Sequence, residues 1–354
     1  MICILAACAS ENSTNVGICK DPSLDPSRLV ESLAKEKNFP GMAVAVGVGS
    51  DIVWTFGYGL GDVASAAPID PEETKFRIGS TSKALTGFAL VKLELQGQLD
   101  LDLPVDTILA ELPAHYDGVT LRQLAGHLGS VRHYNNVSEL GNTTEYTTSR
   151  SALDIFVNDP LVSSPGREFA YSTYGFTVIS AALEARHRKH FSKLMSETVF
   201  DPLRMINTVP DRSTIVPPER TQFYYRDATG ELIIGDNINS SNKWAGGGFL
   251  SSAVDLTKFG LAHFDNTILT TRSRELLWTS QQDAKGKATQ YGVGWFIEDN
   301  WVQHPGGALG GTTVLRIYPE EEVVIVLMAN LSVLGENRFD DLPDLLFECF
   351  SKNR

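Results

Sequence analysis

A serine and a lysine three residues apart stand where a helix is expected to begin. Residues 76–78 form a short extended lead-in to Gly79, and apolar residues after Lys83 recur at helical spacing as far as Gly97. Residues i and i+3 share one face of a helix, so the Lys83 amine can reach the Ser80 hydroxyl. A serine is a weak nucleophile unless a base takes its proton, and a lysine whose pKa is lowered by burial can be that base. The spacing therefore favours a nucleophile and its base.

The alternative is that Ser80, Thr81 and Ser82 only cap the helix. Capping explains the hydroxyls but not Lys83, because a cation in the first turn opposes the helix dipole. A capping box would also place Glu or Gln there. Ser-x-x-Lys is a common tetrapeptide, so other motifs must decide between the two interpretations.

Composition narrows the class of protein. The chain has 354 residues, 42% of them hydrophobic and 21% charged, as in an ordinary globular protein with a sizeable core. Its net charge of −13 argues against nucleic acid and anionic membrane surfaces as partners. No apolar run approaches the length of a transmembrane segment.

The positions of the cysteines bear on metal binding and on whether the protein is exported. None has the spacing of a zinc site, so no metal is expected. The residues up to Cys8, Leu-Ala-Ala-Cys, resemble a bacterial lipoprotein cleavage box, which would make Cys8 a lipid anchor in the cell envelope or periplasm. The alternative is a ragged polar tail on a soluble protein. In an exported protein Cys19 and Cys349 could pair, because both lie near chain ends that would meet in the expected fold.

The order of elements predicts an α/β fold with one antiparallel sheet. Both ends of the chain supply strands and a flanking helix, and a mostly helical region is inserted between them. We expect residues 23–75 and 245–354 to form the sheet region, residues 76–244 to form the helical region that carries the nucleophile, and residues 1–22 to be a tail. The regions together make one structural unit. Expected helices span residues 26–37, 121–126, 151–158, 174–186, 252–264 and 338–351, and expected strands span residues 41–48, 52–58, 292–297, 312–318 and 323–329.

Tyr171-Ser172-Thr173 is a second stretch with acid–base potential. A tyrosine hydroxyl beside a lysine can be polarised or deprotonated and can then act as an acid or a base. The alternative is a helix cap followed by a core aromatic side chain. Tyr171 is thus a possible partner for Lys83.

His304-Pro305-Gly306-Gly307 is expected to lie on a strand. Its glycines would let a substrate backbone lie against the strand edge. A backbone N–H here could join that of Ser80 in an oxyanion hole. The alternative is a bend between two strands. Residues 244–248, Trp-Ala-Gly-Gly-Gly, could line the same cleft or only mark the entry to a helix.

Taken together, these motifs resemble the penicillin-binding and β-lactamase serine hydrolases. The stretch from Phe76 to Lys83, then Tyr171-Ser-Thr, then His304-Pro-Gly occur in that group's order, and the similarity spans roughly residues 25–350. Class C β-lactamases, family VIII carboxylesterases and D-aminopeptidases belong to the group. Through residues 128–134 and 243–251 the chain looks most like the β-lactamase-like serine peptidases of bacteria and mitochondria. The resemblance implies a β-lactamase/transpeptidase-like fold and no cofactor.

The resemblance also implies residue roles. Ser80 matches the acylated nucleophile, Lys83 the lysine that activates it, and Tyr171 the tyrosine that passes a proton to the leaving group. The N–H groups of Ser80 and Gly307 match the oxyanion donors. His127 is expected to be structural rather than catalytic.

Two positions depart from the family's pattern. His304 stands where most β-lactamases have lysine, and Thr173 stands where many have asparagine. A histidine is mostly neutral near pH 7, so the cation suited to a penicillin carboxylate is lost. The expected function is therefore a peptidase or amidohydrolase acting on a peptide or small molecule. The alternatives are a carboxylesterase with weak β-lactamase activity and an inactive scaffold, which the complete set of Ser80, Lys83 and Tyr171 argues against. Some relatives assemble, so a homo-oligomer stays open.

Overall fold

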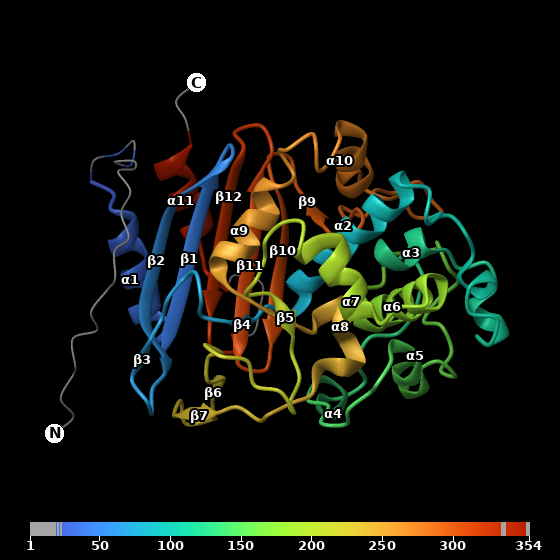
Figure 1. Cartoon of the computed structure of the whole chain (residues 1–354), viewed down its shortest axis with the longest axis horizontal. Coiled ribbons are helices and arrows are strands. Elements are labelled where there is room, and N and C mark those ends of the chain that lie inside the picture. Colours follow the sequence, from blue (N-terminus) through green and yellow to red (C-terminus); the bar gives the residue numbers. More distant parts are fainter. Residues whose placement is uncertain (1–18, 20, 22, 334–337, 352–354) are drawn as a thin grey trace.

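The computed structural model describes residues 19, 21, 23–333 and 338–351. An antiparallel sheet lies at one end of the molecule and a mostly helical region at the other (Figure 1). The sheet has the strand order β3-β2-β1-β12-β11-β10-β9, so the first long strand pairs with the last. The predicted sheet from both ends of the chain is confirmed. Its strands are β1 (Gly41–Val48), β2 (Asp51–Asp62), β3 (Ala67–Pro68), β9 (Phe296–Ile297), β10 (Val302–Ala308), β11 (Gly311–Tyr318) and β12 (Val323–Ala329).

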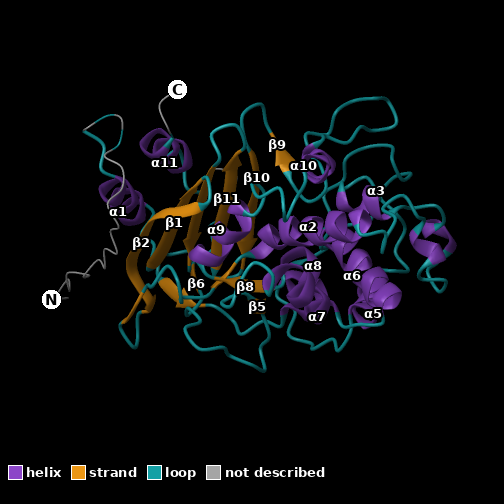
Figure 2. Cartoon of the chain, turned by 45° about the horizontal axis from the view of Figure 1, so that its top comes forward, coloured by secondary structure: helices purple, strands orange, loops and turns teal. Residues whose placement is uncertain are grey.

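Helices cover both faces of this sheet, which is why its central strands are apolar throughout. Side chains alternate along a strand, so Val44 of β1 points to one face and Ala45 to the other. Val44 packs in a cluster with the terminal helices α1 (Pro26–Glu36) and α11 (Leu342–Phe350). Ala45 packs in the larger core on the helical side. Figure 2 shows the terminal helices on one side of the strands and α9 (Ala253–Leu261) on the other.

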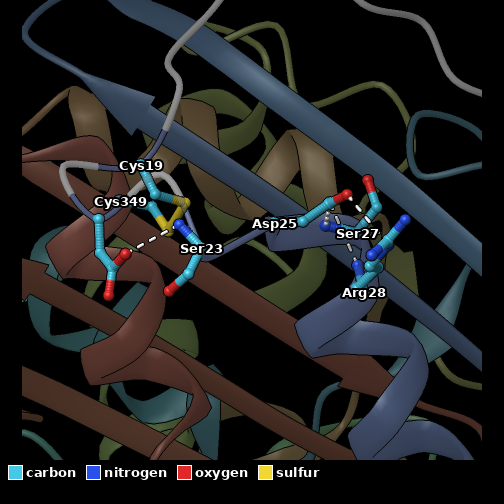
Figure 3. The surroundings of a disulfide bond; sticks show 7 residues. Cys19, Ser23, Asp25, Ser27, Arg28 and Cys349 are labelled. Carbon is cyan, nitrogen blue, oxygen red and sulfur yellow. Dashed lines mark hydrogen bonds and ion pairs between the residues drawn. A yellow bond between two sulfur atoms is a disulfide. The ribbon is translucent and has the colours of Figure 1, made fainter.

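A disulfide bond between Cys19 and Cys349 ties the N-terminal segment to the end of α11 (Figure 3). The hypothesised pairing is therefore present in the structure. Nearby, Asp25 caps α1, because its carboxylate accepts hydrogen bonds from the backbone N–H groups of Ser27 and Arg28. The proposed lipid attachment at Cys8 lies outside the described residues.

The helical region packs around one long buried helix, α2 (Ser82–Leu95), which carries Lys83. Two further small sheets have the strand orders β4-β8-β5 and β6-β7, and Tyr224 of β6 pairs with Leu331, just beyond β12. Among the described residues we find no helix with the length and hydrophobicity that a membrane crossing requires. The other helices of this region are α3 (Leu121–Ala125), α4 (Val137–Leu140), α5 (Ser149–Ala152), α6 (Thr173–His187), α7 (Phe191–Met195), α8 (Trp244–Gly247) and α10 (Thr271–Trp278). The short strands are β4 (Phe76–Arg77), β5 (Val209–Pro210), β6 (Tyr224–Arg226), β7 (Leu232–Ile234) and β8 (Phe249–Ser251).

The predicted strand at residues 292–297 is wrong in its extent, since only Phe296 and Ile297 pair with β10. The preceding backbone N–H groups donate elsewhere, that of Val293 to Leu277 O and that of Gly294 to Ala125 O. The predicted helix at residues 151–158 is also too long, because α5 ends at Ala152 and a single 3-10 turn follows. Helix α10 was not predicted. The division of the chain at residues 75 and 245 stays a prediction.

Candidate active site

Ser80 lies in a tight turn that packs directly against β10. The turn is a 3-10 helix at Gly79–Thr81, between β4 and α2. Gly79 adopts a φ of +48°, which favours glycine. A Cβ on Gly306 would lie 1.9 Å from Ile78 O, so only glycine lets β10 approach the turn this closely. None of the hydroxyls of Ser80, Thr81 and Ser82 caps the helix. The capping interpretation is therefore wrong.

The Lys83 amine is completely buried beside the Ser80 hydroxyl. Its Nζ lies 3.1 Å from Ser80 Oγ, 3.2 Å from Thr173 Oγ1 and 2.6 Å from Gly246 O. No carboxylate among the described residues forms an ion pair with it. Burial holds the pKa of Lys83 well below its usual value, and the charge of Lys243 lowers that pKa further. An unprotonated amine has two N–H donors and one lone pair, so it can donate to Thr173 and Gly246 and still accept the Ser80 proton.

Tyr171 completes a group of three with Ser80 and Lys83. Burial raises its pKa to about 12 and outweighs the effect of the neighbouring Ser80 hydroxyl, which lowers the pKa. Tyr171 therefore keeps its proton near neutral pH. The Lys83 Nζ lies 4.9 Å from the centre of the tyrosine ring, so the amine faces the ring. Behind the ring lies His127, 4.3 Å away between ring centroids, and its Nδ1 accepts a hydrogen bond from Ser172 N.

His304 is fully buried and neutral. Its Nδ1 lies 2.8 Å from Pro305 O, and a carbonyl oxygen can only accept, so Nδ1 carries the proton. The Nε2 atom then accepts from the Tyr291 hydroxyl at 2.9 Å. Burial holds the pKa of His304 well below its usual value. Both ring nitrogens are thus engaged within the protein.

A cavity of about 370 Å³ opens in front of Ser80. Among the described residues no Asp or Glu lines it, although the chain as a whole carries a net charge of −13. Five of the residues expected at the site line it, namely Ser80, Tyr171, Thr173, His304 and Gly307. Lys83 lies beneath Ser80, while Gly306 packs against the nucleophile turn instead of facing the cavity.

Sequence reasoning missed several residues of this cavity. Lys243 and Arg338 bring positive charge to it, and Tyr134 and Phe296 add aromatic walls. The Arg338 guanidinium lies over Gly307, where an added Cβ would be 3.0 Å from both Nη atoms. The glycine-rich stretch after Lys243 was recognised as a possible cleft lining, and a lysine beside it was the available signal. Arg338 offered no comparable signal.

A larger cavity of about 740 Å³ lies elsewhere, between the β1–β2 turn and the end of α9. None of the residues expected at the site lines it. The grouping of Ser80, the buried Lys83 amine and Tyr171 therefore singles out the smaller cavity as the candidate active site.

Known proteins share both the sequence pattern and the fold. The family model described as Beta-lactamase matches residues 27–347. The chain is similar to the serine beta-lactamase-like protein LACTB, mitochondrial, of Homo sapiens, at 29% identity over 431 residues that cover 90% of this chain and 78% of the relative. It is also similar to penicillin-binding protein 4* of Bacillus subtilis (strain 168), at 23% identity with 85% and 70% covered. The predicted resemblance to a bacterial and mitochondrial branch is confirmed.

Two solved structures show the same fold. A penicillin binding protein from Bacillus halodurans superposes with a TM-score of 0.77 at 21% identity, covering 90% of this chain and 98% of the other. The octameric penicillin-binding protein homologue from Pyrococcus abyssi gives a TM-score of 0.74 at 23% identity, with 87% and 74% covered. At such identities the likeness shows the fold alone, and the predicted β-lactamase/transpeptidase-like fold is confirmed.

Proposed function

We propose that this chain, which belongs to the Beta-lactamase family of serine hydrolases, is a peptidase or amidohydrolase that forms an acyl-enzyme on Ser80. The contact between the Lys83 amine and the Ser80 hydroxyl carries the proposal. Burying an amine without a counterion costs folding free energy, and a structural role does not account for that cost. As a base for a serine nucleophile it has a chemical reason.

The reaction begins when Ser80 Oγ attacks the substrate carbonyl carbon and Lys83 accepts the hydroxyl proton. The oxyanion that forms is stabilised by the backbone N–H groups of Ser80 and Gly307, which border the cavity together. The leaving amine then needs a proton. Tyr171 supplies it, and Lys83, whose amine faces the tyrosine, returns to Tyr171 the proton that it took from Ser80. Water finally hydrolyses the acyl-enzyme.

Neutral His304 supports an amide or ester substrate rather than a penicillin. The lysine of β-lactamases would present a cation from β10, whereas the His304 ring is engaged by Tyr291 and Pro305. The carboxylesterase alternative uses the same nucleophile. The leaving alcohol of an ester needs less protonation than the leaving amine of an amide does. Substrate preference distinguishes the two activities.

A fluorophosphonate probe followed by peptide mass spectrometry tests the proposal. We expect one adduct on the Ser80 peptide, absent from the Ser80→Ala variant. No adduct on the folded wild-type protein would refute the mechanism and favour an inactive scaffold. Peptide anilides, p-nitrophenyl esters and a chromogenic cephalosporin then separate the activities. Fast cephalosporin turnover would contradict the argument from His304. Assembly into a homo-oligomer stays a prediction, which light scattering checks.

A further inference from the structure

Two buried lysines from distant parts of the chain lie beside the same cavity, since Lys243 lines it and Lys83 lies beneath Ser80. Lys83 comes from α2, and Lys243 is the last residue of a 3-10 turn, Ser240–Lys243, that leads into α8. Lys83 is 0% exposed and Lys243 is 4% exposed, so water screens neither charge well. The same short segment connects them, because Gly246 O, three residues after Lys243, accepts the hydrogen bond from Lys83 Nζ at 2.6 Å.

The burial of Lys243 is not explained by an ion pair with any described residue. In the described part of the chain its Nζ donates to Leu140 O, and no carboxylate forms an ion pair with it. The acid that acts on its charge is Asp211, whose carboxylate forms an ion pair with Arg77 at 2.8 Å. The Tyr134 ring lies 5.6 Å from the Lys243 amine. An apolar side chain of similar length would fill this place at lower cost, so packing alone does not explain a lysine here.

The charge that Lys243 supplies is missing from β10. The family's usual second lysine stands at the position of His304 in this chain, and His304 is neutral. The groups that face Lys83 are Ser80, Thr173 and the Tyr171 ring, together with the neutral rings of His127, His133 and His304. Of the two cations among the described residues that line the cavity, Lys243 is the one whose charge acts on Lys83, whereas Arg338 acts on Tyr171 and His304.

We infer that Lys243 is a positioning residue for the reaction, whose positive charge keeps the Lys83 amine unprotonated and so able to accept the Ser80 proton. The inference rests on the proposed function, because it assigns Lys83 the role of base. Burial lowers the pKa of Lys243 itself to about 7, so the residue carries its charge mainly below that pH. Below this pH the amines of Lys83 and Lys243 compete for one proton. Lys243 keeps it, because its side chain is the more exposed of the two.

The rate of Ser80 labelling by a fluorophosphonate, measured against pH, tests the inference without a known substrate. The rate rises with pH as Lys83 loses its proton, and this part of the curve of rate against pH is its rising limb. Removing a neighbouring cation makes Lys83 easier to protonate, so its pKa rises. In Lys243→Met the rising limb should move to higher pH by about one unit, which makes labelling about tenfold slower at a fixed pH below the limb. Lys35→Met, which removes an exposed lysine of α1, is the matched control and should leave the limb in place.

Lys243→Arg keeps the test decisive if the methionine variant does not fold. The guanidinium stays charged at every pH used, so the limb should lie at the wild-type pH or below it. The inference would be overturned if the rising limb moved to higher pH in Lys243→Arg, or if it stayed at the wild-type pH in folded Lys243→Met. A purely structural role would lower the rate equally at all pH values. If wild-type Ser80 takes no label, the proposed function itself fails, which is a different result.

Discussion

Gly306→Ala tests whether β10 holds the nucleophile in place. The new methyl group would lie 1.9 Å from Ile78 O and 2.8 Å from Thr81 Oγ1, and real Cβ atoms do not approach a backbone oxygen so closely. The turn that carries Ser80 must therefore move away from the strand by about 1 Å or more to reach ordinary contact. Overpacking of this kind costs about 1–3 kcal/mol of stability.

The same movement would separate the two proposed oxyanion donors. Ser80 N moves with the turn and Gly307 N stays with the strand, so the pair no longer fits one oxygen. A displacement of about 1 Å can reduce a reaction rate about 100-fold. We expect a loss of that size in the rate constant for fluorophosphonate labelling of Ser80. The probe is small, so a residue that only contacts an extended substrate would leave this rate unchanged.

Gly175→Ala is the matched control, since its Cβ would meet no atom closer than 3.7 Å and the residue lies inside α6. It should label at the wild-type rate and should melt at the same or a higher temperature. Labelling of folded Gly306→Ala at the wild-type rate would refute the packing argument and return Gly306 to the role of a substrate contact.

Further variants examine the base, the disulfide bond and the buried ion pair. Lys83→Met should lower Ser80 labelling by roughly 10²–10⁴-fold while the melting temperature holds or rises, because an apolar side chain replaces a buried amine; unchanged labelling would exclude Lys83 as the base. Cys19→Ser removes the bond to Cys349, which spans a sequence separation of 330 residues, and should lower the free energy of unfolding by about 2–5 kcal/mol in chemical denaturation. The reduced wild type should match it, and equal stability of reduced and oxidised protein would contradict this. Arg77→Met leaves Asp211 buried and unpaired, and should cost about 3–5 kcal/mol on the same scale; a loss below 1 kcal/mol would show that solvent or another cation compensates Asp211.

The sequence was a good guide wherever local pattern decides structure. The apolar run at residues 41–48 became β1 with the predicted bounds, and the run at residues 323–329 became β12. Each is a strand buried on both faces, and such strands are apolar along their whole length. The spacing of Ser80 and Lys83 likewise predicts their contact, because helical geometry brings residues three apart together.

Local pattern failed where long-range contacts decide. Residues 292–295 have a strand-like sequence, yet their N–H groups bond to helical segments and to one another. Gly306 was expected to face the substrate, and only the packing of the nucleophile turn reveals that it faces Ile78. A glycine has no side chain to indicate which neighbour approaches it.

Sequence by itself determined the chemistry that this protein carries: a serine with a lysine one helical turn away, followed by a tyrosine and a glycine-rich strand in a recognisable order. The tertiary structure decided the protonation states on which the proposed mechanism depends. Whether Lys83 is neutral depends on complete burial and on the charge of Lys243, 160 residues along the chain. Whether His304 is neutral depends on Tyr291 and on the carbonyl of Pro305. A pKa is set by the solvent and charges around a group, and only the folded chain brings these together.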